Sequence, residues 1–193
     1  VGEKERIEKK PTGDINAYTF YLKGRYLWNE RNKESLEKAI KYFEEAIRRD
    51  AGFALPYAGI ADSYIVLIDH GHLPQSECFA RAKEAARKAL ELDETLVEAH
   101  TSLANILSCE WDWIRADEEF AKALQTYPNY ATAHHWYSIH LLSLGRLDEA
   151  IKELKIAEEL DPLSPMIHAY GGWVYVSARQ YDTALAEVDK ALE

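Results

Sequence analysis

The sequence predicts an all-α protein in which pairs of helices repeat along the chain. Similar side chains recur at a fixed offset of 34 residues, and a period of this length is typical of stacked repeats. Between these positions the apolar residues keep helical spacing. The positions matched at this offset are Ala116 and Ala150, Phe120 and Leu154, Ala123 and Ala157, and Pro128 and Pro162.

The first helical pair follows a charged segment, residues 1–14, which we expect to be a linker. Asp14 is a predicted N-cap for a helix over residues 15–31, because its short carboxylate can accept from free N–H groups in the first turn. A polar break at residues 32–34 precedes a second helix, which we expect over residues 35–49.

The same period places four further helical pairs. Small residues at the crossing points let two helices approach closely, while large ones fill the space to the next pair. The small residues of the first helices are Gly24, Ala61, Ala104, Ser138 and Gly172, and the first alanines of the second helices are Ala39, Ala82, Ala116, Ala150 and Ala184. The array spans residues 15–193, with repeats at about 17–53, 54–96, 97–130, 131–164 and 165–193, the last one truncated.

The period, these columns and the prolines at positions 128 and 162 resemble the tetratricopeptide repeat (TPR) family. The resemblance implies a right-handed superhelical solenoid of five helix–turn–helix hairpins that acts as a protein–protein interaction scaffold. Residues 21–31 and 54–64 and the Trp111–Asp112–Trp113 turn are similar to repeat domains on the C-terminal side of bacterial signalling proteins. That similarity implies a role within a larger signalling or regulatory protein.

Departures from the period lead to specific expectations. Nine extra residues between Ala61 and Ala82 predict a long loop around residues 69–76. Ala86 stands where a bulky residue is usual, which predicts a shallow spot in the core. The first residue is not an initiator and the last falls inside a helical pattern, so we expect a longer native protein. The apolar face of the last repeat should then continue into another repeat or pack against a copy of itself.

Composition and charge argue against several classes of function. A net charge of -10 and a pI near 5.2 argue against nucleic-acid binding, because phosphates require a basic stripe. The basic residues at positions 81–88 are interrupted by Glu84 and predict a solvated face. No apolar run has the length needed for membrane insertion. Cys78 and Cys109 lack disulfide or metal-ligand spacing, so we expect ordinary thiols in a cytoplasmic protein.

Histidines and carboxylates are the candidates for metal binding or catalysis. Three histidines share one repeat position, about 10 Å apart by helix-packing distances, which is too far for ligands about 2 Å from one zinc ion. These packing histidines are His100, His134 and His168. Two further histidines in the loop at residues 69–76 lack a third ligand nearby. We expect the Glu118–Glu119 and Glu158–Glu159 pairs to face solvent, and we therefore predict no metal, no cofactor and no enzymatic activity.

The concave side of the predicted solenoid is the candidate surface for a protein or peptide partner. Exposed aromatic side chains beside a few polar groups favour a peptide groove, although the same aromatics could pack between repeats. Asp62 lies between Arg25 and Asn105 and would repel a peptide carboxylate, so we expect no clamp for a peptide C-terminus. The alternative function is self-association, or an intramolecular regulatory role, through the open C-terminal face. The groove candidates are Tyr18, Tyr21, Arg25, Trp28, Asp62, Asn105, His135, Ile139 and Trp173.

Overall fold

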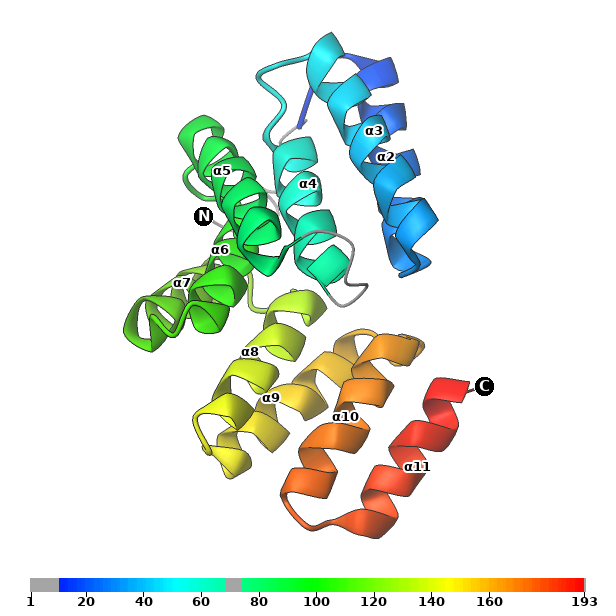
Figure 1. Cartoon of the computed structure of the whole chain (residues 1–193), viewed down its shortest axis with the longest axis vertical. Coiled ribbons are helices and arrows are strands. Elements are labelled where there is room, and N and C mark those ends of the chain that lie inside the picture. Colours follow the sequence, from blue (N-terminus) through cyan, green and yellow to red (C-terminus); the bar gives the residue numbers. More distant parts are fainter. Residues whose placement is uncertain (1–10, 69–73, 193) are drawn as a thin grey trace. The chain divides into compact units, whose positions relative to one another are not determined.

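The computed structural model describes residues 11–68 and 74–192, which form ten α-helices and no strand (Figure 1). Successive helices pack as five hairpins, and the predicted all-α repeat fold is confirmed. The helices are α2 (Ile15–Asn29), α3 (Lys33–Arg49), α4 (Ala54–Leu67), α5 (Gln75–Leu92), α6 (Val97–Cys109), α7 (Trp113–Thr126), α8 (Ala131–Ser143), α9 (Leu147–Leu160), α10 (Pro165–Ser177) and α11 (Tyr181–Leu192).

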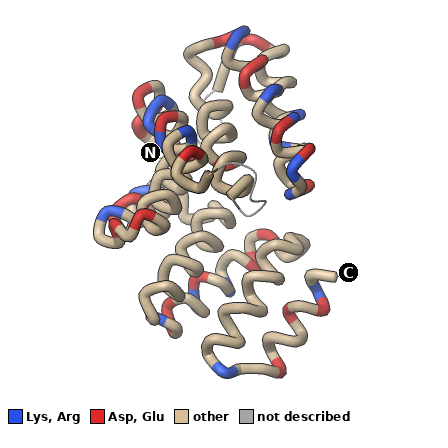
Figure 2. The backbone as a smooth tube through the Cα atoms, viewed as in Figure 1, with Lys and Arg blue, Asp and Glu red and all other residues tan. Residues whose placement is uncertain are grey.

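The chain divides into two compact units, Val1–Thr126 with helices α2 to α7 and Tyr127–Glu193 with helices α8 to α11. Within the first unit α4 contacts both α2 and α6, and within the second unit α8 contacts α10. Charged residues are concentrated on the second helix of each hairpin, as the colours of the backbone in Figure 2 show. Helices α8 and α10 contain no Lys, Arg, Asp or Glu at all. The first helices of the hairpins therefore form the weakly charged layer of each unit.

Side-chain caps set the starts of the first two helices. The Asp14 carboxylate accepts hydrogen bonds from the N–H groups two and three residues further on, at 2.7 and 3.1 Å. The predicted N-cap at Asp14 is confirmed. Asn32 caps the next helix by accepting from the N–H of Ser35 at 3.0 Å. This cap starts α3 at Lys33, two residues earlier than the sequence pattern indicated.

The turn inside a hairpin has the same form in three repeats. A residue with positive φ stands at its centre, and these residues are Trp111 (68°), Gly145 (74°) and Arg179 (60°), each 34 positions from the next. The following N–H then donates to a carbonyl five residues back, as from Asp112 to Leu107 at 3.0 Å. Glycine alone adopts this conformation without a steric cost. The tryptophan at position 111 is therefore held in a backbone conformation that it does not favour.

The first hairpin is built around the ring of Phe43, which is fully buried. A β-carbon added at Gly24 would lie 2.4 Å from Cε1 of the ring, and one added at Gly59 would lie 2.6 Å from Cζ. The ring therefore packs against the bare backbone of both α2 and α4. This close approach explains why the small-residue column begins with a glycine.

Two expectations about the second repeat have different outcomes. Ala86, the predicted shallow spot, is covered: it is fully buried in a cluster that also contains Phe79 and Leu107. Phe79, near the start of α5, supplies the bulk that the alanine lacks. The predicted loop around residues 69–76 lies mostly outside the described residues, and α5 begins at Gln75.

The outer side of α11 carries an exposed apolar stripe. Its members are spaced by four, three and four residues and so lie along one face of the helix. The exposed apolar face predicted for the last repeat is confirmed, and what covers it stays a prediction. The residues of this stripe are Tyr181, Leu185, Val188 and Leu192.

Candidate partner-binding surface

An aromatic cluster occupies the N-terminal half of α2. The ring centroids of Tyr18 and Tyr21 are 6.2 Å apart, and Phe53 lies 5.5 Å from Tyr21. Tyr18 keeps 40% of its surface exposed, whereas Tyr21 is half-buried. Burial raises the pKa of Tyr21, against the opposing effect of the Arg25 guanidinium. The Tyr21 phenol therefore keeps its proton and can both donate and accept hydrogen bonds.

A chain of polar side chains joins the three first helices of the first unit. Arg25 on α2 donates from Nη1 to Oδ2 of Asp62 on α4 at 2.8 Å. The other oxygen of Asp62 accepts from the Ser102 hydroxyl on α6 at 2.5 Å. Burial raises the pKa of Asp62, while Arg25 and Ser102 oppose that rise by bonding its charged form. These contacts fix the register of α2, α4 and α6 through groups that are costly to leave unpaired once buried.

Trp28 lies beneath two guanidinium groups. The guanidinium carbon of Arg25 is 4.2 Å from the ring centroid of Trp28, and that of Arg31 is 3.5 Å from it. Arg31 stands in the α2–α3 turn with a φ of 52°. Stacked guanidinium groups gain cation–π stabilisation and cover the ring. The tryptophan is therefore a buried platform for two arginines.

In the second unit an aromatic row runs from α8 to α10. The rings of His135 and Tyr170 meet edge to face at 5.1 Å, and Tyr170 lies 6.2 Å from Trp173. Trp173 is 52% exposed, and Val176, almost one turn further along α10, is exposed as well. Ile139 on α8 is half-buried. The exposed end of this row is an apolar, uncharged surface.

The predicted groove residues therefore fall into three groups. Tyr18 and Trp173 are exposed, as expected for a binding surface. Three residues are buried, contrary to their expected place on an open groove, and each has a physical cause: guanidinium stacking, ion pairing or ring packing. The buried residues are Trp28, Asp62 and His135, and the half-buried ones are Tyr21, Arg25, Asn105 and Ile139. Contact between any of the nine and a partner stays a prediction.

The three packing histidines have carboxylate partners that the sequence pattern did not reveal. In each case Nδ1 lies 2.5 to 2.6 Å from a glutamate on the second helix of the same hairpin. Nε2 lies 2.7 to 3.0 Å from a backbone carbonyl six residues upstream. Both ring nitrogens lie within hydrogen-bond distance of oxygen acceptors, an arrangement that favours the doubly protonated form of the ring. The pairs are His100 with Glu119, His134 with Glu153 and His168 with Glu187.

Glu119, Glu153 and Glu187 are themselves 34 residues apart, so the repeat offset marks them as one column without indicating that each pairs with a histidine. The expectation that Glu119 and Glu158 face solvent is wrong. Both residues are partly buried within the packed helices. Burial lowers the pKa of each histidine, but bonding to the carbonyl and the carboxylate outweighs it, so all three pKa values are raised. Each pair acts as an ion pair that locks the two helices of a hairpin.

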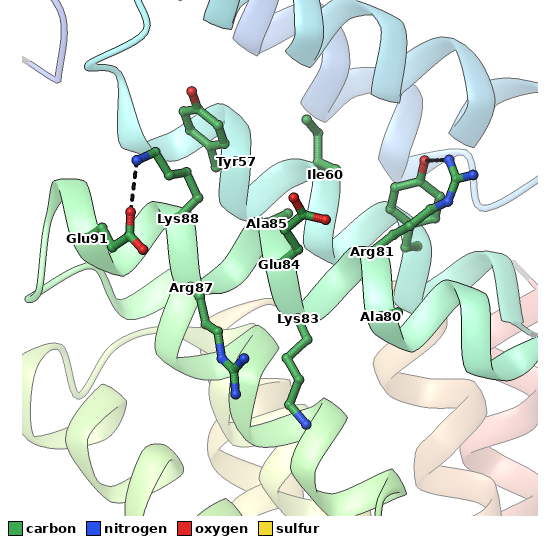
Figure 3. A pocket seen from close by; sticks show the side chains of 11 residues that line it. Tyr57, Ile60, Ala80, Arg81, Lys83, Glu84, Ala85, Arg87, Lys88 and Glu91 are labelled. Carbon is green, nitrogen blue, oxygen red and sulfur yellow. Dashed lines mark hydrogen bonds and ion pairs between the residues drawn. The ribbon is translucent and has the colours of Figure 1, made fainter.

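A separate pocket of about 880 Å³ lies between α4 and α5, and Figure 3 shows the side chains around it. Tyr64 bonds the Arg81 guanidinium at 3.0 Å, and Lys88 bonds Glu91 at 2.8 Å. The basic run at positions 81–88, predicted to be a solvated face, has exposed Arg81, Arg87 and Lys88 and lines this pocket together with Glu84. Mixed charge of this kind gives no strong field for an anion.

Two family models of the tetratricopeptide repeat match this sequence, one over residues 17–53 and the other over residues 112–170. The chain is a tetratricopeptide repeat protein. Its fold is similar to that of TTC0263, a thermophilic TPR protein of Thermus thermophilus, with a TM-score of 0.70, 19% identity and coverage of 91% of this chain and 90% of that one. YrrB, described as a TPR protein with an unusual peptide-binding site, gives a TM-score of 0.50 at 23% identity, covering 98% and 89%. At these identities the likeness shows the fold alone.

Two curated proteins are similar in sequence to part of this TPR chain. The transcriptional regulator HilA of Salmonella typhimurium is 27% identical over 148 residues, which is 77% of this chain and 27% of the regulator. The type IV pilus assembly protein PilF of Pseudomonas aeruginosa is 36% identical over 104 residues, covering 54% of this chain and 40% of PilF. The TPR chain thus spans about a quarter to two fifths of the length of these relatives.

The cysteines and the possible metal ligands are the remaining candidate functional groups of the TPR chain. Neither Cys78 nor Cys109 forms a disulfide within the described residues, and the Cys109 thiol donates a weak hydrogen bond to Oδ1 of Asn105 at 3.9 Å. Among the helices of the described residues, none combines the length and the apolar composition that crossing a membrane requires. Within residues 11–68 and 74–192, one group of histidine and carboxylates has the spacing of metal ligands, namely Glu158, His168 and Glu187. The sequence-based prediction of no metal site did not consider this combination.

Proposed function

We propose that this TPR chain is a protein-interaction scaffold whose first helices bind a peptide or protein segment through an apolar anchor. The observation that carries the proposal is the exposed indole of Trp173 on α10. Helices α8 and α10 contain no Lys, Arg, Asp or Glu, and their ion-paired His134 and His168 are buried, so a partner can bury the apolar surface around Trp173 with little desolvation of charge. Tryptophan is also among the residues that most often dominate binding free energy.

The first unit supports the same function with different chemistry. Tyr18 and Tyr21 offer aromatic surface and phenol groups, and Arg25 is already bonded to Asp62. An arginine that is neutralised in this way gives little attraction for a free carboxylate. The partner segment that fits best is therefore apolar and aromatic, with hydrogen-bonding groups. A role inside a larger signalling or regulatory protein is supported by the partial similarity to the transcriptional regulator HilA.

The test uses peptides selected from a random library displayed on phage against the 193-residue chain. Their affinities are then measured for Trp173→Ala and for Trp111→Ala, a control that removes an even more exposed indole from a hairpin turn. We expect Trp173→Ala to weaken binding about 30-fold, the equivalent of about 2 kcal/mol for a hot-spot side chain. Equal affinity for Trp173→Ala and the wild-type chain would refute the proposed surface.

Self-association through α11 is a second candidate function, favoured by the exposed stripe that contains Leu185. Burying four such side chains against a copy of the chain would remove apolar surface from water. We expect the sedimentation coefficient to rise with protein concentration for the wild-type chain and not for Leu185→Glu. A wild-type coefficient that stays at the monomer value up to high concentration would exclude this candidate.

A further inference from the structure

Three side chains from three helices converge in the second unit. Glu158 comes from α9, His168 from α10 and Glu187 from α11, and one ligand atom from each lies within 4.8 Å of the other two. Imidazole nitrogen and carboxylate oxygen are common zinc ligands. We propose that Glu158, His168 and Glu187 bind one divalent transition-metal cation, with zinc as the best-suited ion. This site is distinct from the proposed partner-binding surface and does not depend on it.

Comparison of the repeats shows that only one of the three histidine–glutamate pairs has a third ligand. The residue ten positions before His168 is Glu158, whereas Leu90 and Leu124 hold that place before the other two histidines. A second departure lies at Gly171, where the preceding repeats have Leu103 and Tyr137. A β-carbon at Gly171 would be 3.4 Å from Oε1 of Glu158, so a large side chain there would fill the space beside the carboxylate. The glutamate at position 158 and the glycine at position 171 thus together leave space for an ion beside His168.

One oxygen of the Glu158 carboxylate lacks a hydrogen bond within the described residues and could therefore coordinate a metal ion. Its Oε1 is buried and has no hydrogen-bond partner among residues 11–68 and 74–192. A buried carboxylate oxygen without a donor is costly, and a cation placed between the carboxylates of Glu158 and Glu187 would remove that cost.

The surroundings fit a zinc ion with an open coordination position. Three protein ligands about 2.0–2.2 Å from the metal imply separations of about 3.4 Å between ligand atoms in a tetrahedral site. The observed limit of 4.8 Å therefore requires only a small closing movement of the side chains. A pocket of about 820 Å³, lined by Glu158, His168 and Lys190 among others, gives a cation and its water access from solvent.

A proton and an ammonium group compete with the metal for its ligand atoms. The proton on Nδ1 of His168 is shared with Glu187, and the Lys190 ammonium bonds the other oxygen of Glu187 at 2.8 Å. Metal binding requires His168 to give up that proton. The lysine side chain is half exposed and can turn toward solvent. Removing this ammonium should therefore strengthen metal binding, and Ile156 occupies its place in the preceding repeat.

The experiment is isothermal titration of Zn²⁺ into the chelator-treated 193-residue chain near pH 7. We expect one ion per chain, an affinity on the order of 10-fold weaker or more for Glu158→Gln, and a stronger affinity for Lys190→Ile. Glu159→Gln is the matched control, because it makes the same charge change on an exposed neighbour and should leave affinity unchanged. Helical content of each variant is compared by circular dichroism, so that loss of the fold is not mistaken for loss of a ligand.

Three results would overturn the proposal. The first is absence of a binding heat in the wild-type chain, and the second is unchanged affinity in a folded Glu158→Gln variant. The third is loss of binding in a variant with glutamine at both positions 70 and 72, which would assign the metal to the histidines of the loop. Unchanged binding in that double variant is the result expected here.

Discussion

Replacing Gly24 by alanine tests how tightly the first hairpin is packed. The added β-carbon would stand 2.4, 2.7 and 2.8 Å from three ring carbons of Phe43, where about 3.5–4.0 Å is the favourable separation. The ring cannot retreat toward α4, because it already packs on the backbone at Gly59. Overpacking costs up to about 3 kcal/mol, and the helix propensity of alanine returns about 1 kcal/mol. We expect the free energy of unfolding to fall by about 2 kcal/mol.

Urea unfolding followed by circular dichroism measures this change. Gly171→Ala is the matched control, because its nearest contacts would be at 3.4 Å and only the gain in helix propensity, up to about 1 kcal/mol, should remain. Phe43→Leu should cost less in the Gly24→Ala background than alone, with a coupling of about 1 kcal/mol. A Gly24→Ala chain as stable as the wild type, or additive effects of the two changes, would refute the packing described for Phe43.

Two further predictions concern the turns and the histidine pairs. Trp111→Gly should raise the free energy of unfolding by about 1 kcal/mol, because glycine adopts the φ of 68° without strain; a clear loss of stability on urea unfolding would show that the exposed indole contributes to the fold. The contribution of the His100–Glu119 pair should be largest near pH 5.5. The raised pKa of His100 gives stability that is complete below the unfolded value of about 6.5 and is lost as pH rises through the folded one. The lowered pKa of Glu119 gives stability that is present above about 4.3 and is lost as pH falls through the folded value. The stability difference between wild type and His100→Gln should therefore be greater at pH 5.5 than at pH 9, and an equal difference at both pH values would contradict the ion pair.

The repeat architecture could be predicted from sequence because it depends on local rules. The 34-residue offset, the N-cap at Asp14 and the small residue at Gly24 each report the backbone conformation or the closest approach of two helices. These features depend little on which side chains lie across the interface. The second helix starts two residues earlier than its helical spacing predicts, because Asn32, which lies in the polar break, caps it.

Burial within the candidate site could not be predicted in the same way. Trp28 was expected on an open surface, but Arg31 reaches it from a turn whose positive φ is invisible to helical spacing. The histidine–glutamate pairs join residues 19 apart, a separation that belongs to no helical period and becomes short only when a hairpin closes. The offset of 34 between the three glutamates was present in the sequence, and it needed the structure to give it meaning.

Photo-crosslinking tests the proposed binding surface most directly. Benzoylphenylalanine is placed at position 173 in one variant and at position 111 in another, and a library-selected peptide is added before irradiation and mass spectrometry. If the first helices of the second unit bind the partner, the peptide should be linked from position 173 and not from position 111. Efficient linking from position 111 with none from position 173 would contradict the assignment of the binding surface to α10.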